Sequence, residues 1–131
     1  MLFRSPLAMA AGLATLALLA DGAPWRAAER WAASAEEILT RAARAAGVPL
    51  IVQRSGTILT PFFTAAPVRD FAGAKASDRA AYARFFHHML NHGVYLPPSP
   101  FEAAFTSAAH GAAELAIFDS AVSTAFTRLA A

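Results

Sequence analysis

The amino-acid sequence predicts one α+β domain, with helices packed on a small, mostly antiparallel sheet. Its 131 residues suit a single domain. Hydrophobic residues make up 56% of the chain and charged residues 15%, which excludes a disordered, highly charged tail. Helical and strand-like patterns follow one another in the order helix, helix, hairpin, helix, strand, strand, helix. That order, and not an alternation of single strands with helices, indicates the α+β class.

The composition also excludes several classes of function. The chain has no cysteine, so disulfides, thiolate zinc sites and cysteine nucleophiles are absent. The net charge is +2, but the arginines are scattered, so no charged stripe indicates a nucleic-acid partner. Lys75 is the only lysine among eleven basic residues. Arginine does not form imines, so Lys75 is the one side chain with an imine-forming amine.

The first element has two interpretations that the residues leave open. Arg4 followed by the apolar run from Leu7 to Ala20 is typical of a secretory signal. The same run is also typical of a buried helix, with Ser5 as its N-cap and Pro6 at its first position. Asp21-Gly22 would end that helix, and the run is too short to span a bilayer.

A second helix is expected from Pro24 to about Ala46, ended by a left-handed Gly47. Its apolar positions recur with the helical period. They are Ala28, Trp31, Ala35, Ile38, Leu39, Ala42 and Ala46. Two β-rich runs, 50–54 and 57–60, then flank Ser55-Gly56 and predict a hairpin. Pro61 has no N–H for a ladder bond, so the second strand is expected to lie at an edge or to bend there.

The second half of the sequence predicts a loop over 65–76 and then a third helix, capped by Ser77-Asp78 and ended by Gly93. Its expected core stripe is Tyr82, Phe85, Phe86, Met89 and Leu90. Two short strands are predicted next, over 94–96 and within the alternating stretch 101–107. A last helix is expected to start at Gly111, with Glu114 at its third position as a capping residue.

Histidines are the first candidates for chemistry. His87, His88 and His92 gather at the end of the third helix, and His110 lies further along. His88 and His92 are four residues apart and share a helix face, but a zinc site needs a third ligand. Protonated histidines also suit the negative end of a helix dipole. The pattern therefore favours a structural role and predicts no metal site.

Glu102 is the more informative residue, because apolar and rigid residues surround it in LPPSPFEAAF. A carboxylate there is either solvated at an edge strand or directed at a ligand in a cleft. The preceding prolines fix the backbone, as is common before a site residue. No nucleophile–base set and no phosphate-binding glycine loop accompanies it, so the residues alone indicate no reaction.

Several stretches resemble one family in the same order. They are SPLAMAAG from Ser5, FFT from Phe62, PVRDF from Pro67, ARFFH from Ala83, GVYLPPS from Gly93, FEA from Phe101 and SAAH from Ser107. Together they resemble the C-terminal part of the glutamate-1-semialdehyde 2,1-aminomutases, pyridoxal-phosphate (PLP) enzymes of the class-III aminotransferase family. The GVYLPPS and FEA motifs are the most specific. Ser5, the stretch Thr57-Ile58-Leu59, Pro100 and Gly111 depart from the residues that are usual in the family.

The resemblance implies the small C-terminal domain of a fold-type I PLP enzyme. Residues 1–22 would form the interdomain helix, which makes a secretory signal the minor interpretation, and 23–131 the small α+β domain. The large PLP-binding domain would be absent. The family converts glutamate 1-semialdehyde to 5-aminolevulinate for tetrapyrrole biosynthesis, as a cytoplasmic or plastid homodimer.

The resemblance also implies where the chemistry lies. The family's imine-forming lysine belongs to the large domain, and Lys75 is not at its position. PLP would therefore not be bound by this chain alone, and no catalytic or metal-binding residue is expected here. Glu102 matches the family glutamate near the substrate's amino groups, and so it is the candidate substrate-binding residue. The chain is expected to be inactive alone, cytoplasmic, and without a membrane or nucleic-acid partner. The alternative is a free-standing, non-catalytic interaction domain.

Overall fold

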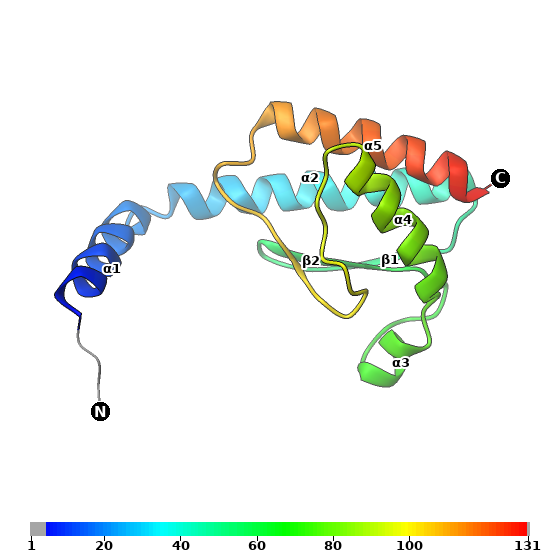
Figure 1. Cartoon of the computed structure of the whole chain (residues 1–131), viewed down its shortest axis with the longest axis horizontal. Coiled ribbons are helices and arrows are strands. Elements are labelled where there is room, and N and C mark those ends of the chain that lie inside the picture. Colours follow the sequence, from blue (N-terminus) through cyan, green and yellow to red (C-terminus); the bar gives the residue numbers. More distant parts are fainter. Residues whose placement is uncertain (1–4, 131) are drawn as a thin grey trace.

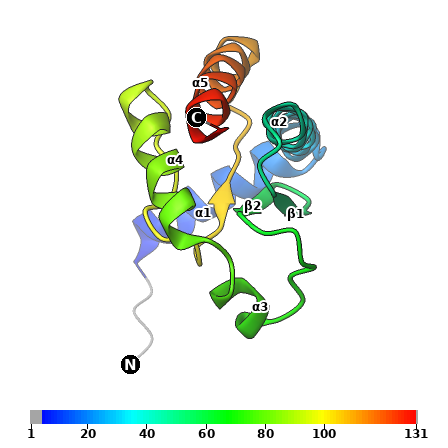
Figure 2. The ribbon, with the colours of Figure 1, turned by 90° about the vertical axis from the view of Figure 1, so that its right-hand side faces the viewer.

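The computed structural model describes residues 5–130, which fold into five helices and a three-stranded sheet (Figure 1). The predicted α+β class is confirmed. The helices are α1 (Pro6–Leu19), α2 (Ala23–Ala46), α3 (Phe71–Lys75), α4 (Arg79–Asn91) and α5 (Ala112–Ala130), and the strands are β1 (Ile51–Ser55), β2 (Ile58–Phe62) and β3 (Ala104–Phe105). Helices α2, α4 and α5 lie on one side of the sheet, whereas α1 projects away from the body (Figures 1 and 2).

Helix α1 begins as the sequence predicts. The Ser5 hydroxyl accepts a hydrogen bond from the Ala8 N–H at 3.4 Å, and Pro6 occupies the first helical position. The helix ends before Gly22, whose φ of 70° is left-handed. No residue of α1 is buried in this chain, contrary to a buried helix. Arg4, on which the secretory interpretation depends, lies outside the described residues.

Within residues 5–130, no single helix is long and apolar enough to cross a membrane. Helices α1 and α2 pass that test only as a pair, and they are bent by 69° relative to each other.

Helix α2 forms one side of the hydrophobic core. It ends at the left-handed Gly47, as predicted. Its buried residues are Ala28, Ala32, Ala35, Ile38, Leu39 and Ala43. Because most of these side chains are small, α5 packs closely along α2. Phe63, Phe85 and Phe126 fill the space between the helices and the sheet, with ring centroids 5.4 to 5.9 Å apart.

The sheet has the order β1-β2-β3 and is antiparallel throughout. The predicted hairpin is confirmed, and its turn contains Gly56 with a φ of 58°. Pro61 belongs to the middle strand, so the expected edge position is wrong. However, β3 pairs only with Ile58 and Leu59. Pro61 therefore lies beyond the end of β3, where no strand needs its missing N–H.

Two predicted strands differ from the structure. Residues 94–96 form no strand, because the Val94 N–H turns back to the Met89 carbonyl at 2.9 Å and closes the end of α4. The alternating stretch 101–107 is reduced to Ala104–Phe105, because Glu102 is drawn into a turn with Ser99.

Two smaller expectations about helices are also corrected. Residues 71–75 of the predicted loop form the short helix α3, because the Asp70 carboxylate accepts from the Gly73 N–H at 2.8 Å. Leu90 is 42% exposed and does not join the α4 core stripe. The remaining α4 positions pack as expected, with Phe86 half-buried.

Candidate functional site

Glu102 lies in a loop that holds itself in place. Its N–H donates to the Ser99 carbonyl at 3.2 Å, and one of its carboxylate oxygens accepts from the Ser99 N–H at 3.3 Å. The Phe101 N–H donates to the Ser99 hydroxyl at 3.2 Å. The side chain is exposed, and within residues 5–130 its second carboxylate oxygen accepts no hydrogen bond. The loop therefore presents one carboxylate oxygen outward on a backbone that Pro97, Pro98 and Pro100 stiffen.

Tyr82 of α4 holds the loop that carries Glu102 in place. Its hydroxyl donates to the Pro97 carbonyl at 2.6 Å, and the residue is 3% exposed. Burial, together with the nearby charge of Glu102, raises the pKa of Tyr82 to about 12. The phenol is therefore a neutral donor across the physiological range. The sequence placed Tyr82 only in the core stripe, because its link to Pro97 spans fifteen positions and leaves no local signal.

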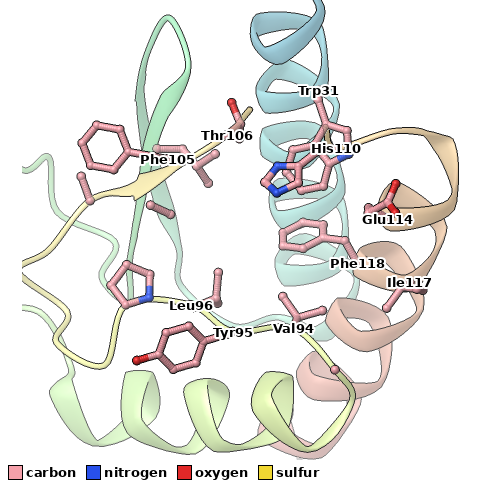
Figure 3. A pocket seen from close by; sticks show the side chains of 15 residues that line it. Trp31, Val94, Tyr95, Leu96, Phe105, Thr106, His110, Glu114, Ile117 and Phe118 are labelled. Carbon is pink, nitrogen blue, oxygen red and sulfur yellow. The ribbon is translucent and has the colours of Figure 1, made fainter. Parts of the chain in front are cut away.

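A cavity of about 400 Å³ opens next to β3, on the side of α2 and α5 (Figure 3). Its lining is mostly apolar and excludes Glu102. It comprises Trp31, Leu59, Ile117, Phe118 and the segments 93–97 and 103–106, together with His110 and Glu114. The sequence did not single out this cavity, because its walls come from five separate stretches of chain.

Two polar side chains of the cavity, His110 and Glu114, lie at the start of α5. The Glu114 carboxylate accepts from the Gly111 N–H at 2.8 Å, which confirms the predicted cap. Hydrogen bonds from backbone N–H groups lower the pKa of Glu114. The Trp31 indole N–H donates to the Gly111 carbonyl at 3.2 Å, and its ring packs against His110 with centroids 5.0 Å apart.

The histidines at the end of α4 pack on each other. The rings of His88 and His92 stack with centroids 4.0 Å apart, and His92 Nδ1 lies 2.8 Å from the His88 carbonyl oxygen. Burial, followed by the charges of His92 and Arg128, lowers the pKa of His88. Across the part of the chain that the structure describes, no three His, Asp or Glu residues are grouped to hold a metal.

The residues that line the cavity beside β3 do not fit PLP. Lys75 is exposed on α3 and does not line the cavity beside β3. That cavity has no lysine or arginine in its lining to balance a phosphate group.

Comparisons with known proteins indicate which family the chain is similar to. No protein-family model matches the sequence. The glutamate-1-semialdehyde 2,1-aminomutase of Pelotomaculum thermopropionicum is 48% identical over 111 residues, covering 85% of this chain and 26% of that enzyme. The enzyme of Myxococcus xanthus is 47% identical over 125 residues, covering 95% of this chain and 29% of that enzyme. The chain is homologous to one part of the glutamate-1-semialdehyde 2,1-aminomutases. The predicted resemblance is thus confirmed.

Solved structures support the same fold. The FumI protein of Sphingopyxis sp. MTA144, solved with PLP, superposes with a TM-score of 0.74 at 22% identity, over 92% of this chain and 26% of FumI. A glutamate-1-semialdehyde aminomutase from Pseudomonas aeruginosa PAO1 superposes with a TM-score of 0.71 at 21% identity, over 81% of this chain and 23% of that chain. The fold is therefore that of a fragment of these larger enzymes. The chain spans about a quarter of the length of its aminomutase relatives.

Proposed function

We propose that this chain is the small C-terminal domain of a PLP-dependent glutamate-1-semialdehyde 2,1-aminomutase and carries one wall of its active site. The supporting observation is the identity of 47% to 48% over most of the chain, against about a quarter of each aminomutase. The partner is the large PLP-binding domain, and the complete enzyme is a cytoplasmic homodimer. Residues 1–22 connect the two domains, and 23–131 form the small one.

In this proposal, Glu102 binds the amino groups of the substrate. A carboxylate is suited to orient an ammonium group, and orientation lowers the barrier only if the carboxylate is itself held in place. Two hydrogen bonds with Ser99 and the Tyr82–Pro97 contact meet that requirement. One carboxylate oxygen is used in positioning the loop, and the other is left for the ligand.

The first experiment compares the chain with a chimera. The chimera is the Pelotomaculum thermopropionicum enzyme with its matching segment replaced by this chain. We expect the chimera to form 5-aminolevulinate from glutamate 1-semialdehyde with PLP, and the chain alone to form none. Turnover by the chain alone would contradict the proposal. So would a folded, PLP-binding chimera without turnover, which would favour the non-catalytic interaction domain.

The second experiment tests Glu102 within the chimera. We expect Glu102→Gln to lower kcat/KM about 10- to 100-fold, because the charge opposite the substrate ammonium is lost while the loop hydrogen bond is kept. Glu37→Gln, on the exposed face of α2, is the matched control and should leave kcat/KM unchanged. Equal effects of the two substitutions would remove Glu102 from the active site.

A further inference from the structure

The outer edge of β3 has open backbone groups. The Thr106 N–H donates to the Thr57 carbonyl at 3.0 Å, and Phe105 is paired with Ile58. Successive residues of an antiparallel strand point their N–H and C=O groups to opposite sides. The N–H and C=O of Phe105 therefore point away from β2. Since β3 is the last strand of the sheet, they face the open side.

The cavity beside β3 is flanked by a second segment without strand pairing. Residues 103–106 line one part of the cavity and residues 93–97 another (Figure 3). Val94–Leu96 has a strand-like sequence, but within residues 5–130 no backbone hydrogen bond joins it to β3. Two stretches of backbone with strand character thus flank an apolar space.

The rim of the cavity is apolar as well. Tyr95 is 74% exposed and Ile117 is 50% exposed, while Leu96 and Phe118 close the interior; the Phe105 ring points away from the cavity (Figure 3). Glu114 is the one acidic residue in the lining. Exposed apolar side chains around a cavity that continues into the core are typical of a protein–protein contact. Together with an open strand edge, they favour an extended polypeptide over a small molecule.

We propose that an extended segment of the rest of the aminomutase lies in this cavity and adds a strand to β3. The inference rests on the proposed function. The segment that matches this chain is only 26% to 29% of each aminomutase relative. The rest of such an enzyme therefore contains enough polypeptide to cover the cavity beside β3. The added strand pairs with the Phe105 N–H and C=O and places apolar side chains over Leu96 and Phe118.

Hydrogen exchange at the Phe105 amide tests this pairing. We expect fast exchange in the isolated chain, because the N–H points to solvent. In the chimera we expect exchange to slow by about 100-fold or more, as for a paired strand. The Ala104 amide is the internal control, because the same alternation directs it toward Leu59 of β2 in both proteins. A second chimera on the Myxococcus xanthus enzyme replaces the first if that one does not fold.

The possible results separate this inference from the proposed function. Fast exchange at Phe105 in a chimera that turns over substrate overturns the strand addition and leaves the proposed function intact. Slow exchange in a chimera without turnover supports the strand addition and contradicts the proposed function. Protection in the isolated chain that grows with protein concentration assigns the edge to a second copy of this chain, and overturns the inference.

A pair of substitutions checks the same hydrogen bond. Phe105→Ala removes the ring and keeps the N–H, whereas Phe105→Pro removes both. We expect the two variants to have the same thermal midpoint in the isolated chain, because the N–H has no partner there. In the chimera, the proline variant should melt several degrees lower than the alanine variant. Equal midpoints in the chimera would overturn the inference.

Discussion

Helices α1 and α2 are both alanine-rich, yet only α2 enters the core. Charged residues recur along α2, so the helix has a polar face for solvent and a stripe of small apolar residues for α5 and the sheet. In α1, Leu7, Leu13, Leu16 and Leu18 point in several directions and are 66% to 81% exposed. A helix that is apolar all round needs cover on every side, and residues 5–130 provide none. The alanine-rich composition thus predicts that both segments are helical. The distribution of polar residues around each helix predicts whether it packs in the core of this chain.

The largest expected effect on stability comes from comparing a substitution in the core with one in α1. Phe85→Ala should lower the free energy of unfolding by about 3 to 5 kcal/mol, because Phe85 is fully buried between Phe63 and Phe126. Leu13→Ala should change it by less than about 0.5 kcal/mol, because Leu13 is 67% exposed. Urea unfolding of both variants measures the difference. A large loss in Leu13→Ala would show that α1 packs on this chain in solution.

A smaller effect is expected where the body meets the Glu102 loop. The pKa of Tyr82 is raised from 10.0 to about 12, so the neutral phenol stabilises the folded state. That stability is fully present below pH 10 and is lost as the pH rises through 12, by about 3 kcal/mol in all. Tyr82→Phe should remove most of this slope between pH 10 and 12.

At neutral pH, Tyr82→Phe should lower the free energy of unfolding by about 1 kcal/mol, because the hydrogen bond to the Pro97 carbonyl is lost. Chemical unfolding at a series of pH values measures both effects. A slope that is unchanged in Tyr82→Phe would assign it to another group.

The smallest effects are expected for the two ion pairs of α2. Arg54 and Glu36 join β1 to α2 at 2.6 Å, with side chains 26% and 35% exposed. Arg41 and Asp119 join α2 to α5 at 2.8 Å, with side chains 62% and 43% exposed. Double-mutant cycles with alanine should give about 0.5 to 1 kcal/mol for the first pair and a few tenths for the second, because water screens the exposed pair more. The reverse order would contradict this dependence on exposure.

Local signals account for the parts of the fold that the sequence predicted. Ser5, Asp78, Gly47 and Glu114 each act within four residues of their own position, and each cap is present in the structure. The strand expected at 94–96 is absent because strand formation depends on a partner from elsewhere in the chain, and residues 5–130 supply none. Helix α3 forms where glycine, proline and charge predict a loop, because the Asp70 carboxylate caps its first turn.

The candidate site also has features that depend on local sequence and features that depend on long-range contacts. The stiff backbone before Glu102 could be predicted, because prolines act locally. The turn with Ser99, the support from Tyr82 and the cavity beside β3 depend on contacts across the fold. The role of Glu102 stays a prediction, since it came from the resemblance to the aminomutases and no contact within this chain tests it.

The single lysine has a practical consequence for measurement. Lys75 is exposed in the last turn of α3, and every other basic side chain is an arginine or a histidine. An amine-reactive dye that forms an amide therefore attaches stably, among side chains, at one position, because acylated imidazole hydrolyses. Because α3 packs beside Phe62 and Val68 outside the main core, such a dye would report on that small cluster and on whatever docks next to it. The wild-type chain thus already contains a site-specific fluorescence handle.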